Sequence, residues 1–163
     1  MSGKARYVMP DTPNAQMPGV ALAGTPRTYV GAYALCVRDD RLLLARMGPG
    51  TVDVGKWTLP GGGLNWGEDP AHGVLRELDE ETGLAGTIIG LAGVYSRANL
   101  RSPDRPRDPV HHLGIVYTVE VRGAELRHEV RGSTDFCAWV PLTDLATLAL
   151  VPLAAYAATL IAS

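Results

Sequence analysis

The sequence predicts an α/β protein, and three observations favour this class. A helix is expected between Asp69, which has the character of an N-cap and precedes a proline, and Gly83, which supplies a C-terminal stop. Strand-like segments lie on both sides of this helix. The chain closes with an apolar stretch, Leu142 to Ala162, in which Asp144 and Pro152 favour two short helices over a membrane span.

The remaining elements follow a tail that is rich in proline and glycine. Residues 1–27 carry four prolines and no pattern that would build a core, so the domain is placed at 28–163. The expected strands are Tyr29 to Val37, Leu42 to Arg46, a strand-rich segment from Thr87 to Ala98, His111 to Val121, and Phe136 to Val140. A turn is expected at 38–41 and loops at 47–56 and 99–109.

Composition limits the classes of function. With 163 residues, of which 46% are hydrophobic and 20% charged, the chain fits one globular domain. A net charge of −2 argues against bulk binding to nucleic acid or to an anionic membrane. Lys4 and Arg6 are not followed by an apolar segment, so no signal peptide is expected and a cytoplasmic location is predicted. Cys36 and Cys137 lie in apolar strand-like runs and are interpreted as buried, reduced thiols.

The predicted helix carries an unusual group of acidic residues. Glu77, Glu80 and Glu81 are three and four residues apart, so they share one side of the helix. Three carboxylates on one side repel each other. Their clustering is best explained by a hard divalent cation, which prefers oxygen ligands. The core-facing stripe is expected at Ala71, Val74, Leu75 and Leu78. The glycines just upstream, residues 61–63, let the backbone approach closely.

These residues resemble a known family motif, the Nudix box G-x5-E-x7-R-E-U-x-E-E-x-G-U, in which U is apolar. All nine fixed positions match: Gly62, Glu68, Arg76, Glu77, Leu78, Glu80, Glu81, Gly83 and Leu84. The run Gly55 to Gly61 also looks like the segment that precedes this box. The resemblance covers about residues 28–162, and it implies the Nudix fold, an α/β/α sandwich with a mixed β-sheet.

The resemblance also implies a chemistry and a set of roles. Nudix hydrolases cleave a pyrophosphate bond in a nucleoside diphosphate linked to another moiety, with Mg²⁺ or Mn²⁺ bound. By this resemblance Glu77 and Glu81 are metal ligands, Glu80 is a third ligand, and the carbonyl of Gly61 is a further candidate. Arg76 is expected to hold the carboxylates in place with Glu68 as its partner.

The general base is less defined by the motif. In this family it comes from the box or from a later loop, which here offers Glu125, Glu129 and Asp135. Glu129 is preferred because a glycine-containing segment follows it. The alternative interpretation of Glu129 is a solvated loop carboxylate, as is common for such positions.

Candidate substrate contacts lie outside the box. Arg97 and Arg101 belong to an arginine-rich loop suited to phosphate, although most such loops are only solvated. Trp66 could stack on a base, whereas Trp57 is expected in the core. Adjacent strand residues face opposite sides, so His111 and His112 are predicted to be one surface and one interior histidine.

Substrate identity and class are left open by the sequence. About sixteen residues beyond the box, where some Nudix subfamilies carry Pro or Tyr, this chain has Asn99-Leu100-Arg101. That departure weakens an assignment to ADP-ribose and leaves a (deoxy)nucleoside triphosphate as the default nucleotide-like substrate. The alternatives are a non-hydrolytic, nucleotide-sensing Nudix domain and an isoprenoid-type isomerase, which would need a cysteine and a glutamate across its pocket. A homodimer also stays open.

Overall fold

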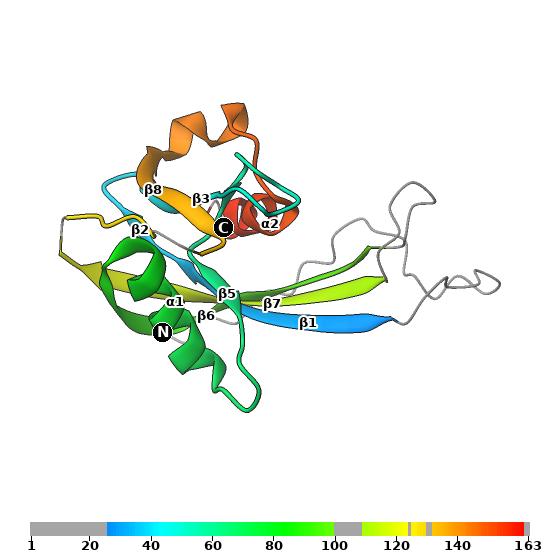
Figure 1. Cartoon of the computed structure of the whole chain (residues 1–163). Coiled ribbons are helices and arrows are strands. Elements are labelled where there is room, and N and C mark those ends of the chain that lie inside the picture. The colour runs from blue at the N-terminus through cyan, green and yellow to red at the C-terminus, as the bar shows by residue number, and fades with distance from the viewer. Residues whose placement is uncertain (1–25, 100–108, 124, 130–131, 162–163) are drawn as a thin grey trace.

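The computed structural model describes residues 26–99, 109–123, 125–129 and 132–161 (Figure 1). The elements in chain order are β1 (Arg27–Leu35), β2 (Val37–Arg38), β3 (Arg41–Met47), β4 (Trp57–Thr58), β5 (Gly61–Gly63), α1 (Pro70–Thr82), β6 (Ala85–Asn99), β7 (Val110–Arg122), β8 (Thr134–Pro141), the 3-10 helix η1 (Leu142–Thr147) and α2 (Pro152–Ile161). Within these residues, no helix combines the length and apolar character needed to cross a membrane. The tail predicted at 1–27 lies almost wholly outside the described residues.

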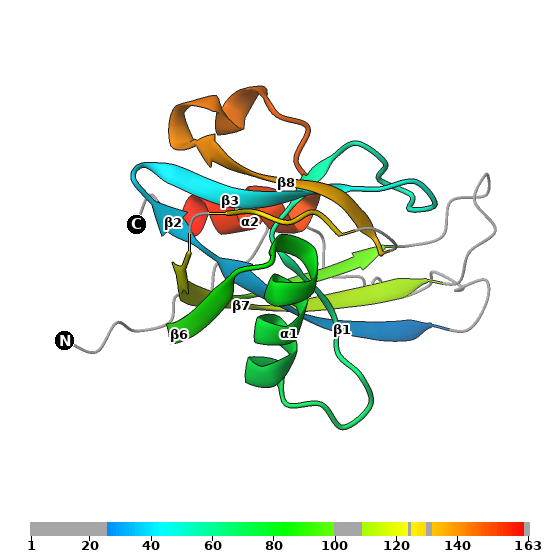
Figure 2. The same ribbon diagram turned by 60° about the vertical axis from the view of Figure 1, so that its left-hand side comes forward.

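The strands form two sheets rather than one continuous sheet (Figure 2). Sheet A has the order β5-β1-β7-β6, in which β1 and β7 run parallel and the outer pairs are antiparallel. Sheet B places β3 between β4 and β8, with β2 also paired to β3, and its pairs are antiparallel. The predicted mixed sheet is therefore sheet A.

Two clusters of buried side chains hold the helices against the strands. One cluster joins α2 to the strands through Leu153, Ala154 and Tyr156, with Tyr33, Leu44 and Tyr95 among its strand members. The other joins α1 through Val74 and Leu78 to Ala32, Leu43 and Val119. Each helix thus buries a different face of the strand layer, which is the layering of an α/β/α sandwich. Figure 1 shows the two helices well apart, with strands between them.

The helix that carries the acidic residues begins and ends where the sequence predicts. The Asp69 side chain accepts a hydrogen bond of 2.8 Å from the N–H of Ala71, and Pro70 is the first helical residue. Gly83 ends α1 with a φ of 72°, and its N–H donates to the carbonyl of Asp79. The core-facing stripe of α1 also differs from the one expected, because Glu81, which was not included in it, is buried at only 2% exposure.

Two further boundaries differ from the sequence expectation. The strand predicted at Tyr29–Val37 is split at Cys36, where the chain leaves sheet A as β1 and enters sheet B as β2. A continuous apolar run gives no indication of such a crossing, because residues buried in either sheet look alike. The two predicted C-terminal helices are present, but the first, η1, is a 3-10 helix.

Candidate functional site

The site is built where α1 packs against the edge strand β5. Glu77 and Glu81 lie one turn apart on α1 and both contact this strand. The N–H of Gly61 donates a 2.9 Å hydrogen bond to Oε2 of Glu81. A Cβ atom added to Gly62 would lie 2.8 Å from Oε2 of Glu77. A side chain at this position would displace the Glu77 carboxylate, so the glycine lets the backbone of β5 lie close to it.

Gly61 has a second reason to be glycine. Its φ of 143° lies in a region that other residues rarely adopt, and a Cβ atom there would collide with the carbonyl oxygen of Ala32. This backbone aims the Gly61 N–H at Glu81. Gly61 therefore lies against Glu81, one residue before Gly62, which Glu77 approaches.

Glu81 is a buried carboxylate whose partners are incomplete. Its Oε1 atom is shielded from solvent and makes no hydrogen bond with the described residues. Burial raises the pKa of Glu81 to about 8; the Gly61 hydrogen bond and the nearby Thr134 hydroxyl oppose the shift, and the charges of Glu77 and Glu129 reinforce it. An unpaired buried carboxylate oxygen is costly. A cation ligated by this oxygen would satisfy it.

Arg76 ties the acidic residues together. Its guanidinium binds Glu68 through two nitrogens, at 2.8 and 2.9 Å, in the forked geometry typical of arginine and carboxylate. Its Nη1 atom also donates to Glu77 at 2.6 Å and to Glu80 at 3.1 Å. The predicted pairing of Arg76 with Glu68 is present. Burial raises the pKa of Glu77, and Arg76 counteracts this shift.

The carboxylate oxygens of Glu77, Glu80 and Glu81 are suitable donors for a hard cation, although they do not converge on one point. Within the described residues, no three acidic, histidine or cysteine side chains converge closely enough to form a ready-made metal site. Nη1 of Arg76 instead contacts oxygens of both Glu77 and Glu80. The unpaired oxygen of Glu81 is the position that a cation would satisfy, and carboxylate oxygens are suitable ligands for Mg²⁺.

The loop before β8 brings a fourth carboxylate to this group. Glu129 accepts a 2.9 Å hydrogen bond from the Thr134 hydroxyl, and its charge contributes to the raised pKa of both Glu77 and Glu81. Asp135 instead pairs with Arg46 at 2.9 Å, at an exposed position on sheet B. Thr134 was not among the expected site residues, because its partnership depends on how the loop folds back and not on a sequence spacing.

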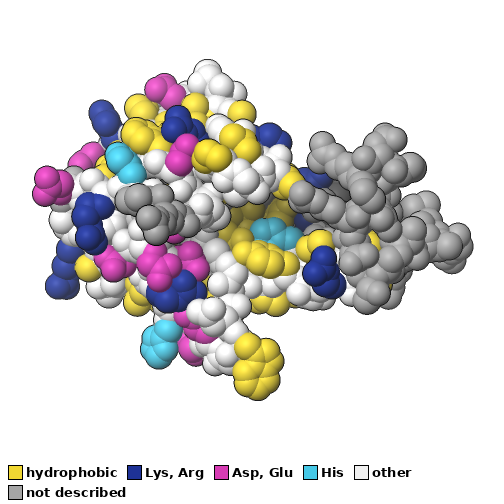
Figure 3. Space-filling model, in the orientation of Figure 1, with side chains coloured by type: hydrophobic (Ala, Val, Ile, Leu, Met, Phe, Trp, Pro, Cys, Tyr) yellow, Lys and Arg dark blue, Asp and Glu magenta, His cyan; other side chains and the backbone are white. Residues whose placement is uncertain are grey.

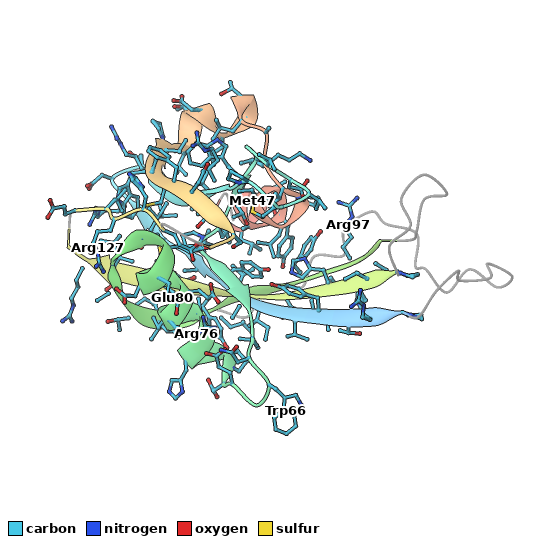
Figure 4. The ribbon with its side chains drawn as sticks, in the orientation of Figure 1. Met47, Trp66, Arg76, Glu80, Arg97 and Arg127 are labelled. Atoms are coloured by element: carbon cyan, nitrogen blue, oxygen red, sulfur yellow. The ribbon has the colours of Figure 1, made fainter. Side chains whose placement is uncertain are left out.

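The expected substrate contacts are dispersed. Trp66 is fully exposed in the loop between β5 and α1, and Figure 4 shows it pointing away from Glu80. Arg97 extends from β6, at a distance from the acidic residues (Figure 4), and Arg101 lies outside the described residues. The two histidines separate as predicted, since His111 is exposed and His112 is half-buried. Trp57 packs against the core as predicted.

Comparison with known proteins agrees with this geometry. A family profile described as NUDIX domain matches residues 25–161. The ADP-ribose pyrophosphatase of Methanocaldococcus jannaschii is 40% identical over 99 residues, which are 60% of this chain and 54% of that protein. The RNA pyrophosphohydrolase of Acidiphilium cryptum is 50% identical over 91 residues, or 54% of this chain and 51% of that protein. The matches thus span about half the length of these curated relatives.

Solved structures support the same assignment. A MutT NUDIX hydrolase from Burkholderia pseudomallei superposes with a TM-score of 0.67 at 27% identity, covering 82% of this chain and 98% of that chain. The fold and the acidic helix define a member of the Nudix hydrolase class. With the profile matching most of its length, this chain belongs to the Nudix family, and the fold predicted from the box is confirmed.

Proposed function

We propose that this protein hydrolyses a pyrophosphate bond in a nucleoside diphosphate linked to another moiety, and that it requires Mg²⁺ or Mn²⁺. The single observation that supports the proposal best is Glu81, a buried carboxylate with one unpaired oxygen beside Glu77 and the β5 glycines. In an ordinary core this helix position would carry an apolar residue, because an unpaired buried charge is destabilising. The default substrate is a (deoxy)nucleoside triphosphate.

The residues divide the chemistry among them. Glu77, Glu80 and Glu81 would hold the cation, with the Gly61 carbonyl as a further ligand. The cation supplies charge neutralisation at the phosphate oxygens and lowers the pKa of water. Arg76 keeps the carboxylates oriented through its contacts with Glu68, Glu77 and Glu80. Glu129, held by Thr134, would accept a proton from the water that forms the new bond to phosphorus while the anhydride P–O bond breaks.

The two other classes are less well supported. A Nudix domain that only senses nucleotides would not need this complete set of carboxylates, since sensing domains tend to lose them. An isomerase would need a reactive cysteine, yet Cys36 and Cys137 are buried and burial raises their pKa values to about 12 and about 11. For Cys137, the charge of Glu81 adds to the shift.

A substrate panel tests the proposal. The purified chain would be incubated with Mg²⁺ and with ribo- and deoxynucleoside triphosphates, ADP-ribose or 5′-triphosphorylated RNA, and the products would be separated by chromatography. The last two are chosen because relatives are named ADP-ribose pyrophosphatase and RNA pyrophosphohydrolase. We expect cleavage of at least one anhydride that stops with EDTA. Full activity in a rigorously metal-free preparation, or no cleavage across the panel, would contradict the proposal.

A further inference from the structure

A row of glycines crosses sheet A beside the acidic site. Gly63 of β5 pairs with Gly31 of β1, which pairs with Gly114 of β7, and Gly114 pairs with Tyr95 of β6. Directly paired residues present their side chains on the same face of a sheet. Three adjacent positions without side chains therefore leave room on that face for side chains from neighbouring positions and from α2.

Tyrosine rings and Leu153 of α2 take up this room, and a Cβ atom on Gly114 would lie 2.5 Å from Cδ1 of Leu153. A Cβ atom on Gly31 would lie 2.7 Å from the hydroxyl of Tyr33, and one on Gly63 would lie 2.8 Å from the hydroxyl of Tyr29. The glycines are thus required for the two rings to lie where they do. Tyr33 is buried in the core cluster of α2, whereas Tyr29 is 43% exposed.

The next row outward from the core is polar and aromatic. Tyr29 of β1 pairs with His112 of β7, and His112 pairs with Arg97 of β6, so the three side chains share the face of the glycine row. We call them the Tyr29–His112–Arg97 row. The imidazole contacts the rings of Tyr29, Tyr33 and Tyr95 with centroid distances of 5.1, 5.8 and 5.5 Å.

Hydrogen bonding orients His112 within these rings. Its Nε2 atom lies 2.9 Å from the Tyr33 hydroxyl, which fixes the ring plane. Burial lowers the pKa of His112, with a smaller contribution from His111, so the neutral form with one donor and one acceptor nitrogen is favoured. Figure 3 shows a hollow in which hydrophobic side chains surround a histidine, next to the mixed acidic and basic patch.

The hollow and the carboxylates lie on opposite faces of β5. Gly62 faces Glu77, while its neighbour Gly63 faces Tyr29 on the other side. Burial raises the pKa of Tyr29 and Tyr33, and the charges of Glu77 and Glu81 add to both shifts. The two groups are therefore within electrostatic reach. Because β5 is an edge strand, an extended ligand can pass around it and contact both.

We propose that the Tyr29–His112–Arg97 row is the specificity-determining surface for the heteroaromatic base of the nucleotide substrate. Tyr29 and His112 offer ring faces and edges for stacking and hydrogen bonding, and the planar guanidinium of Arg97 closes the row. The members of the row are polar and exposed or half-buried, and none of them belongs to the buried cluster beneath, so core packing does not account for them. This inference rests on the proposed function, because it says which residues contact the base of the proposed nucleotide substrate.

Ligand binding without turnover tests the inference. Isothermal titration calorimetry in EDTA would compare the four nucleoside monophosphates with ribose 5-phosphate, which lacks the base. We expect the wild type to bind at least one nucleoside monophosphate more tightly than ribose 5-phosphate. His112→Ala should raise the Kd for that nucleotide at least tenfold and leave the Kd for ribose 5-phosphate within threefold. Tyr29→Leu, which keeps apolar area at an exposed position, should act in the same direction and serves if His112→Ala fails to fold.

His111→Ala is the matched control. His111 is the next residue of the same strand, but it is exposed and contacts Ser96 on the opposite face, at 2.9 Å. Its variant should bind nucleotides as the wild type does. Equal binding of nucleotide and ribose 5-phosphate by the wild type, or unchanged nucleotide binding in folded Tyr29→Leu, would overturn the inference. Base-dependent binding without hydrolysis would uphold the inference while overturning the proposed function, so the two failures are distinguishable.

Discussion

Glu81 is a buried acidic residue with one carboxyl oxygen unpaired, so the stability of the protein depends on what occupies the site. The pKa of Glu81 is raised from 4.5 to about 8, above its value in the unfolded chain. Between these pH values the unfolded state is ionised while the folded state holds the proton. In EDTA, stability should therefore fall as pH rises from about 4.5 to 8.

The variant Glu81→Gln separates this effect from catalysis. Glutamine keeps the size of the side chain and an acceptor for the Gly61 N–H but removes the charge. In EDTA at the upper end of that pH window, we expect the variant to have a higher Tm than the wild type. Excess Mg²⁺ should raise the Tm of the wild type only, and kcat of the variant should fall on the order of 10³-fold. A tenfold or smaller effect on kcat with the fold intact would contradict direct metal ligation.

The thiols make a second prediction for single residues. Because burial raises the pKa of Cys36 to about 12 and that of Cys137 to about 11, thiolate is scarce in the folded protein near neutral pH. A thiol-specific disulfide reagent should react slowly with native protein and rapidly with both thiols after unfolding in guanidinium. Rapid labelling of either thiol in the native state would instead reopen the isomerase alternative.

Single elements show which parts of the fold were predictable. The caps of α1 depend on residues within one turn of Asp69 and Gly83, so local sequence is sufficient to place them. The crossing at Cys36 and the burial of Glu81 depend on which strands lie on either side, and these neighbours are distant in sequence. The motif therefore singled out the candidate site residues on α1, while their burial and contacts required the structure.

The loop before β8 gives a prediction at the scale of an element. The Thr134 hydroxyl holds Glu129, whose charge helps to raise the pKa values of Glu77 and Glu81. Asp135 on β8 instead pairs with Arg46. If Glu129 is the general base, Glu129→Gln should lower kcat, remove the acidic limb of the pH–rate profile and leave metal affinity nearly unchanged. Asp135→Asn is the matched control, and we expect kcat close to that of the wild type.

Metal affinity can be measured for both variants by the Mg²⁺-dependent rise in Tm. Wild-type kinetics in Glu129→Gln on the best substrate would place the base elsewhere, at Glu77 or Glu80 of the box. A fall in both kcat and metal affinity would instead indicate that Glu129 helps to hold the cation.

On the scale of the whole molecule, the arrangement of the two sheets decides what surrounds the acidic helix. The glycine row exists only because β5, β1 and β7 align Gly63, Gly31 and Gly114, and their registers join segments up to 83 positions apart in sequence. No local spacing predicts such an alignment. The Nudix box predicted the family and the layering, yet Tyr29, Tyr33 and Tyr95 were not recognised as neighbours of His112.

The boundary between tail and domain gives the last prediction. The first described contact of the domain is the N–H of Arg27, which donates a 2.9 Å hydrogen bond to the carbonyl of Pro109 as β1 begins beside β7. Deleting residues 1–20 removes nothing that pairs with this strand in the described part of the chain. We expect the truncated protein to keep the urea midpoint and the Mg²⁺-dependent Tm shift of the full chain, because both core clusters and the acidic site lie within residues 26–161. Sedimentation of both proteins would show whether the tail contributes to a homodimer. A truncated chain that cannot fold would mean that the boundary at residues 27 and 28 is misplaced and that the tail belongs to the domain.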